Sequence, residues 1–426
     1  MNKTGIIKIT IFLLVSANGM FGQIDLSLPD CLAKVRSSAG ASRQIDLVQQ
    51  TADLNQKVVS RNYWPQASIG GKATWQSDVT SLPIDIPNFM VPTVPQDQYA
   101  ATLDVSQPIY DGGVTQALKQ IRTAESDLKI NQLESEILNS ERQAIDLFFQ
   151  MALQKNIIAN TTFLKNQLQT SLKQAEDLLE AGVLDKGDVS SIRVKLYEAN
   201  QKIIEATYHL STAKKSLANM MQHPDTLFTV VVGRPSDRVK SAALENRPEI
   251  KAIMARKDLL LAQSRLNDAK VRPSMGAFIN AGYGRPGLNF LANSFDWFAL
   301  GGVKLTLPID HFYSKKTEMQ NQINELQIES SNLSRKDLLH QFERLEFQYR
   351  DEIEKLESWI REDRNIVELR EGIQSISDAK WKAGIITTTE YLATVTDLNI
   401  AQERLASHEN ILTKMQALLT NLYSTK

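Results

Sequence analysis

The 426-residue sequence is poor in proline over most of its length. All thirteen prolines lie outside two long stretches, 109–223 and 309–426. Because a proline costs about 3 kcal/mol inside a helix, its absence over these stretches permits very long helices. At about 1.5 Å of rise per residue, Val114–Glu180 and Ser314–Ala383 could each span ~100 Å, which is too long for a compact globule.

Cysteine and strong net charge are also lacking. The single cysteine, Cys31, excludes an intramolecular disulfide and a cysteine-based metal site, and we expect it to be a small apolar residue near the first helix. A net charge of -1 gives no field that would favour nucleic acid. The five histidines have no paired ligand spacing, His209 and His408 are expected at helix edges, and no nucleophile motif or phosphate loop is present. We therefore predict no enzyme, no catalytic or metal-binding residues and no cofactor.

Long apolar runs are absent as well. Residues 1–22 have the pattern of a cleaved secretory signal peptide, with Lys3 and Lys8 before the apolar run Ile9–Val15. That run is too short for a spanning helix, and the surroundings of Cys31 do not resemble a lipidation site, so we expect no lipid anchor. The mature protein is therefore expected to be exported, and strands must make any membrane crossing.

The chain contains the same plan twice. Gln107-Pro108-Ile109 in the first copy corresponds to Leu307-Pro308-Ile309 in the second, and Ala181-Gly182-Val183 corresponds to Ala383-Gly384-Ile385. A duplication that keeps turn residues in step marks a repeated architecture. We expect one repeat over 23–240 and a second over 241–426, each with a preceding helix (43–62 or 241–271), two strands and a helical hairpin. A connecting segment, 222–241, separates them.

Four segments of about ten residues alternate with a period of two, which predicts strands with one apolar and one polar face. The pattern is typical of membrane-spanning strands, although a half-buried soluble sheet has the same alternation. Phe278, Phe298 and Leu300 break it. In the membrane interpretation, the lipid-facing residues include Ile69, Leu103, Ile279 and Val303, and the lumen-facing residues include Ser68, Lys72, Thr102, Asp104 and Lys304.

Four strands cannot close a barrel, because about eight are needed and an open edge is not tolerated in lipid. If the strands meet lipid, several chains must share one barrel. Residues 76–98 and 285–296 would then be its extracellular loops.

The long stretches after the strands have apolar residues at steps of three and four, which favours coiled-coil packing of helical hairpins. Tyr391, Thr394 and His408 are exceptions in the second copy. Gly182 and Gly384 are expected to be C-terminal helix caps. Asp188 in the first copy, and Thr388 or Thr389 in the second, are expected to cap the returning helices.

The order and duplication of several motifs resemble those of the TolC family of outer-membrane efflux ducts. The matching motifs, besides the two Ala-Gly-Val/Ile turns, are Tyr63-Trp64-Pro65, Ser106-Gln107-Pro108-Ile109-Tyr110-Asp111-Gly112-Gly113 and Arg247-Pro248-Glu249-Ile250. The resemblance covers nearly the whole mature chain.

The resemblance implies a mainly helical homotrimer. Three copies would share a twelve-strand β-barrel in the outer-membrane lipid of a Gram-negative bacterium, continuing into a long periplasmic coiled-coil α-barrel. Such proteins are passive exit ducts that join an inner-membrane transporter through a periplasmic adaptor protein. The adaptor would dock at the turns, here Ala181, Gly182, Val183, Ala383, Gly384 and Ile385, and the pore-constricting acids would be Asp188 and Glu390.

Two positions depart from the family's best-known member. Ala393 stands where that protein has a second acidic ring, and Ile386 where it has an arginine lock. The expected function is an efflux or type I secretion duct of unspecified cargo. The alternative is a periplasmic coiled-coil scaffold or tether, which would not need four alternating strands.

Overall fold

The computed structural model describes residues 24–79, 94–223, 228–233, 244–289 and 293–424. The predicted signal peptide lies outside these ranges, as do parts of the two predicted loops and of the connecting segment. In chain order the elements are β1 (Ile24–Ser27), α1 (Leu28–Ser38), α2 (Gly40–Ser60), the 3-10 helix η1 (Arg61–Tyr63), β2 (Gln66–Trp75), β3 (Asp97–Tyr110), α3 (Val114–Glu180), α4 (Lys186–Met220), β4 (Phe228–Val231), the 3-10 helix η2 (Leu244–Asn246), α5 (Pro248–Lys270), β5 (Ser274–Arg285), β6 (Asp296–Thr306), α6 (His311–Ser314), α7 (Lys316–Lys382) and α8 (Thr388–Leu422).

The chain forms two compact units. The first, here called the hairpin unit, comprises the described residues of 1–38, 140–238 and 351–418. The second, the sheet unit, comprises those of 39–139, 239–350 and 419–426. The predicted long helices are confirmed, since α3 and α7 each have 67 residues and the returning helices α4 and α8 each have 35.

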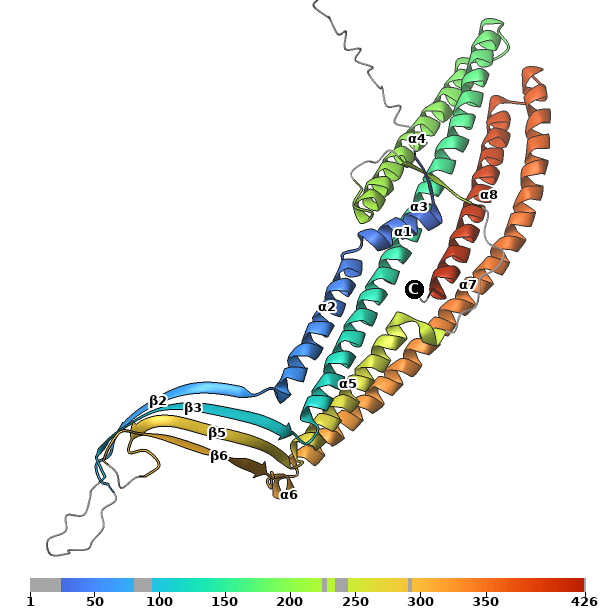
Figure 1. The fold of residues 1–426 in the computed structure, drawn as a ribbon. Coiled ribbons are helices and arrows are strands. Elements are labelled where there is room, and N and C mark those ends of the chain that lie inside the picture. The colour runs from blue at the N-terminus through green and yellow to red at the C-terminus, as the bar shows by residue number, and fades with distance from the viewer. Residues whose placement is uncertain (1–23, 80–93, 224–227, 234–243, 290–292, 425–426) are drawn as a thin grey trace, which may run out of the picture. The chain divides into compact units, whose positions relative to one another are not determined.

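The sheet unit contains one four-stranded antiparallel sheet in the order β2-β3-β5-β6 (Figure 1). Its register pairs Ile69 with Leu103 and Leu103 with Ala281, so the odd-numbered residues of all four strands share one face. The even-numbered residues share the other. The two predicted sets of strand residues therefore lie on opposite faces.

The register also accounts for two of the apolar exceptions on the even-numbered face. Phe278 pairs with Gly302 and Phe298 pairs with Gly282. A Cβ added at Gly302 would come 3.2 Å from the Phe278 ring, and one at Gly282 would come 2.6 Å from that of Phe298. Each ring thus lies against a glycine of the neighbouring strand, where it covers backbone that has no side chain of its own.

Helix α3 begins at a junction that explains two of the sequence motifs. The Asp111 carboxylate accepts hydrogen bonds from the backbone N–H groups of Gly113 and Thr115, at 3.0 and 2.7 Å, and from the Tyr63 hydroxyl at 2.8 Å. Gly112 has a φ of 70°, and a Cβ there would come 2.7 Å from the carbonyl oxygen of Ala269. Only glycine meets both requirements without strain.

The Arg247 motif holds the end of α8 in the sheet unit. The Arg247 side chain, only 6% exposed, donates to the carbonyl oxygen of Leu422 at 2.5 Å and forms a two-point ion pair with Glu249. Its guanidinium carbon lies 4.4 Å from the centre of the Phe342 ring. A buried cation is tolerable here because a carboxylate, a helix terminus and an aromatic face all compensate for its lost hydration.

The sequence analysis missed three short elements, β1, α1 and β4. In the hairpin unit β1 pairs in parallel with β4, which lies in the predicted connecting segment, and α1 follows β1 directly. Four-residue strands are too short for periodicity to reveal them. Cys31 in α1 is fully buried, as expected for a small apolar residue, and burial raises the pKa of its thiol to about 12.

Six members of the apolar repeat expected in α4 are buried, namely Val189, Ile192, Ala199, Ala206, Ala213 and Leu217. Two of the three exceptions in α8 nevertheless lie at packed positions. Tyr391 is only 1% exposed and belongs to the core. His408 is half-buried, its Nδ1 lies 2.5 Å from the buried Asp363 carboxylate of α7, and its ring contacts that of Trp359 in a tilted arrangement. Among the described helices, none is long and apolar enough to cross a membrane.

Candidate gate and docking tips

The two helical hairpins of the hairpin unit turn in the same way. Gly182 and Gly384 adopt φ angles of 73° and 69°. The N–H of each glycine donates three residues back, to Leu179 or Trp381, and that of the next residue donates five back, to Leu178 or Lys380. This is the Schellman motif, so the predicted glycine caps are confirmed.

Each turn exposes one large apolar side chain immediately after its glycine. Val183 is 55% exposed and Ile385 is 70% exposed. A Cβ added at Gly384 would lie 3.7 Å from Cγ1 of Val183, so the two turns are neighbours. All six residues predicted for docking therefore come together at one place.

The candidate gate acids each belong to a helix N-terminal capping box. Asp185 caps α4 by accepting from the N–H of Asp188 at 2.9 Å, and the Asp188 carboxylate accepts from the N–H of Asp185 at 3.1 Å. Thr387 and Glu390 exchange the equivalent bonds at the start of α8, at 3.2 and 2.8 Å. The predicted cap positions were therefore wrong by one to three residues, because a reciprocal box places the acid at the third helical position.

Capping affects the charge on Glu390. Its carboxylate accepts from the backbone N–H of Thr387 and from the Thr387 hydroxyl, and these bonds lower the pKa of Glu390 below its ordinary value. Each cap uses one carboxylate oxygen, Oδ2 of Asp188 or Oε2 of Glu390. The cap bonds thus hold both carboxylates close to the turns, and they favour the ionised form of Glu390.

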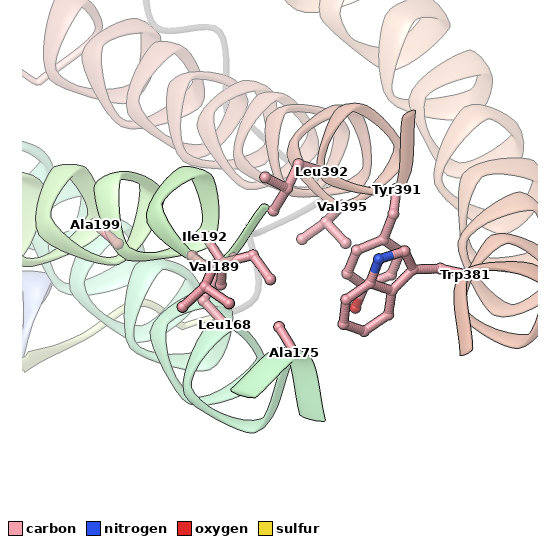
Figure 2. Packing of buried hydrophobic residues seen from close by; sticks show 9 residues of the cluster. All are labelled: Leu168, Ala175, Val189, Ile192, Ala199, Trp381, Tyr391, Leu392 and Val395. Carbon is pink, nitrogen blue, oxygen red and sulfur yellow. The ribbon is translucent and has the colours of Figure 1, made fainter. Parts of the chain in front are cut away.

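A shared core joins the two hairpins just behind the turns (Figure 2). The first hairpin contributes Leu168, Ala175, Val189, Ile192 and Ala199, and the second contributes Trp381, Tyr391, Leu392 and Val395. The rings of Trp381 and Tyr391 stack at 4.5 Å with 6° between their planes. Ile386 packs against this core.

Buried polar groups in this core have partners in both hairpins. The indole N–H of Trp381 donates to the Thr388 hydroxyl at 3.1 Å, and the Tyr391 and Ser171 hydroxyls share a hydrogen bond of 2.8 Å. Burial is the main cause that raises the pKa of Tyr391, so its hydroxyl stays neutral. Farther from the turns, Lys202 of α4 binds both oxygens of Glu403 of α8, at 2.5 and 2.6 Å.

The faces of the sheet differ in chemistry. On the odd-numbered face the predicted lipid-facing residues Ile69, Leu103, Ile279 and Val303 are all exposed. Near the hairpin loops this face carries a group of aromatic side chains, in which Tyr283 lies 5.7 Å from Phe295 and 5.1 Å from Trp297. At the opposite end of the strands, Trp64, Phe312 and Tyr313 are exposed. Apolar residues between two aromatic bands are typical of strands that cross a membrane.

The even-numbered face carries the predicted lumen residues Ser68, Lys72, Thr102, Asp104 and Lys304. Here the Thr102 hydroxyl donates to Asp104 at 3.1 Å, and the Asn280 amide also donates to that carboxylate. The sheet has two unpaired edges among the described residues, since β2 pairs only with β3 and β6 only with β5.

The chain thus combines an antiparallel sheet that has one exposed apolar face with two long helical hairpins. The family model described as outer membrane efflux protein matches residues 44–222, so the resemblance to TolC-family proteins is confirmed. No match was found among curated proteins.

Solved structures share the fold over nearly the whole chain. The outer membrane protein VceC from Vibrio cholerae is similar with 15% identity and a TM-score of 0.71, covering 93% of this chain and 96% of VceC. CusC has 15% identity and a TM-score of 0.75, with 96% and 95% covered. The open state of the MtrE outer membrane channel of Neisseria gonorrhoeae has 12% identity and a TM-score of 0.67, with 100% and 97% covered.

Proposed function

We propose that this protein is an outer-membrane exit duct, assembled from three copies. The observation that carries the proposal is the four-stranded sheet, which exposes an apolar face and leaves both edges unpaired. In lipid, an unpaired backbone group costs several kcal/mol, so the edges must be closed by other strands. Three copies supply twelve, enough for an open barrel.

Exposed apolar side chains on the helices support lateral association. In the hairpin unit the outward face of α4 carries Val194, Tyr197, Ile204 and Tyr208, and α7 carries Ile366, Leu369, Ile373 and Ile376. In the sheet unit α2 carries Leu47, Leu54 and Val58, and α7 carries Met319, Ile323, Leu326 and Leu333. In the proposed assembly the stripe on α4 or α2 of one copy meets the stripe on α7 of the next, so two different surfaces form each contact and the association is head to tail. Such contacts close into a ring when the rotation from one copy to the next divides a full circle.

In the proposed assembly the odd-numbered face contacts lipid and the even-numbered face lines the lumen. The turns at Gly182 and Gly384 dock a periplasmic adaptor protein through Val183 and Ile385, and an inner-membrane transporter supplies the cargo. Exposed apolar side chains held by rigid turns are suited to docking, because little order is lost on binding. The two halves of the chain, 23–240 and 241–426, are proposed to be structural repeats.

Asp188 and Glu390 form the proposed constriction. Each is present once per chain, so a trimer has three copies of each carboxylate near its axis at the turns. Rings of carboxylates favour cations and bind multivalent ones. Replacing both with Asn and Gln should reduce cation selectivity and weaken block by trivalent cations, while leaving the trimer intact. Unchanged selectivity with lower thermal stability would leave these residues only their capping role.

Planar-bilayer recording tests the function. Protein extracted from outer membranes should give stepwise conductance, and the trimer should be its conducting form. As a matched pair, Leu103→Arg on the odd-numbered face should destabilise insertion by about 2–4 kcal/mol, whereas Thr102→Arg on the even-numbered face should insert normally. A protein that fractionates with soluble periplasmic proteins and never conducts would instead be the scaffold considered from the sequence.

A further inference from the structure

The helix-proximal end of the sheet has two kinds of junction. Strands β3 and β5 are the inner strands, and their junctions with α3 and α5 are closed by Gly112 against the backbone of Ala269. Strands β2 and β6 are the edge strands, and their junctions expose aromatic and cationic side chains. β2 begins and β6 ends at the same end of the sheet, because Gln66 aligns with Ser106 and Ser274 with Thr306.

Both edge junctions expose aromatic and cationic side chains together. Before β2, Trp64 is 62% exposed and the Arg61 guanidinium lies 5.2 Å from its ring centre. After β6, Phe312 is 72% and Tyr313 77% exposed. Lys315 and Lys316 follow them, both exposed. Aromatic residues this exposed are unusual on a surface that faces only water.

The junction after β6 departs from its counterpart after β3. In the first half Gly112 and Gly113 make a tight turn directly into α3, whereas the second half inserts α6 and turns at Lys315 with a φ of 49°. A left-handed lysine costs about 1–2 kcal/mol relative to an ordinary conformation. The chain keeps this costlier turn, which presents Phe312 and Tyr313, where two glycines suffice in the first half.

Closing the sheet brings the two edge junctions together. When β6 of one copy pairs with β2 of the next, Phe312, Tyr313, Lys315 and Lys316 of one copy lie beside Arg61 and Trp64 of its neighbour. This pairing of β6 with β2 of the next copy rests on the proposed trimer. Each of the three subunit boundaries then carries aromatic side chains and three cations, with Asp310 and Glu318 as the carboxylates of residues 310–318.

We propose that each subunit boundary binds the headgroup of an anionic phospholipid in the periplasm-facing leaflet of the membrane. The exposed apolar side chains of Leu305, Leu307 and Ile309 lead continuously from the lipid-facing strand to Phe312. Tyrosine and tryptophan favour the headgroup level of a bilayer, and lysine beside them contacts phosphate. The cations beside these aromatic side chains favour an anionic lipid over a zwitterionic one.

Native mass spectrometry of the trimer with added phosphatidylglycerol or phosphatidylcholine tests the proposal. The unaltered protein should retain up to three phosphatidylglycerol molecules in preference to phosphatidylcholine. Lys315→Gln with Lys316→Gln should weaken phosphatidylglycerol binding by roughly 25-fold, at about fivefold per cation near a charged lipid. Arg61→Gln should weaken it by about fivefold, because the site draws a cation from the neighbouring copy.

Matched controls separate the outcomes. Lys186→Gln with Lys380→Gln removes two exposed lysines from the hairpin turns and should leave lipid binding unchanged. Equal binding by the two double variants would overturn the proposal. So would displacement of phosphatidylglycerol by millimolar glycerol phosphate, which has the headgroup chemistry without acyl chains. If Phe312→Ser with Tyr313→Ser reduces the fraction of trimer while the remaining trimers retain as much lipid, the junctions are protein contacts instead. Failure of the unaltered protein to form a trimer would count against the proposed function rather than the lipid site.

Discussion

The first and second helical hairpins have helices of the same length and the same turn but different interiors. Their helices match in length, 67 and 35 residues in each, and their turns share one hydrogen-bond pattern. Yet the first contributes small aliphatic side chains to the shared core, whereas the second contributes the stacked Trp381 and Tyr391. Turn residues and helix length thus fix the architecture, and the side chains that fill it are free to diverge.

The largest expected difference between the hairpins is in how much their core side chains contribute to the free energy of unfolding. Trp381→Ala should lower the free energy of unfolding by about 3–5 kcal/mol, because a fully buried indole and its stacking on Tyr391 are both lost. In the first hairpin, Ile192→Val should cost only about 0.5–1.5 kcal/mol. Thermal unfolding of the detergent-solubilised protein measures both. Similar losses for the two variants would mean that the hairpins contribute equally.

The junctions after β3 and β6 should respond in opposite directions. Gly112→Ala should destabilise the protein by about 2–4 kcal/mol, since it combines left-handed strain with a clash against the Ala269 backbone. Lys315→Gly should stabilise it by up to about 1 kcal/mol, because glycine relieves the left-handed strain. Denaturant unfolding gives both values, and a tolerated Gly112→Ala would refute the close backbone contact.

Much of this architecture could be predicted from the sequence, for identifiable reasons. Missing prolines and the Ala-Gly-Val/Ile pairs indicated the hairpins, and period-two alternation placed all four strands. The core role of Tyr391 could not be predicted, because a tyrosine in an apolar register is read as polar until Ser171 and Trp381 are seen beside it. β1 and β4 were too short to show periodicity. The gate and docking residues came from family resemblance rather than from the local pattern.

The two capping boxes should be nearly equal despite their different chemistry. Asp185→Ala and Thr387→Ala should each cost about 1 kcal/mol, because each removes the acceptor of an orphan helix N–H. Comparison by thermal unfolding tests this, with Lys186→Gln as a control at an exposed position whose side chain takes no part in the box. A loss confined to one hairpin would show that its counterpart is capped by another group.

The smallest effect concerns pH. A carboxylate whose pKa is lowered by folding contributes stability above its unfolded pKa, and this contribution is lost as pH falls through the folded pKa. Glu390 should therefore keep its charge as pH falls through 4.5, its ordinary value, because Thr387 stabilises the anion. Cation selectivity of the channel should persist in that range and fall earlier in Thr387→Val. Identical pH profiles would contradict this.

Cysteine cross-linking across the sheet edges tests the central claim most directly, that separate chains close one barrel. The only native cysteine, Cys31, is buried with its thiol pKa raised to about 12, and Cys31→Ser gives a clean background. Ser68→Cys on β2 would be combined in turn with Leu300→Cys, Gly302→Cys or Lys304→Cys on β6, all on the even-numbered face. After oxidation in intact outer membranes, at least one pair should give covalent dimers and trimers, with the trimer as the largest product. Only monomeric chains for every pair, despite complete loss of free thiol, would contradict a barrel shared between copies.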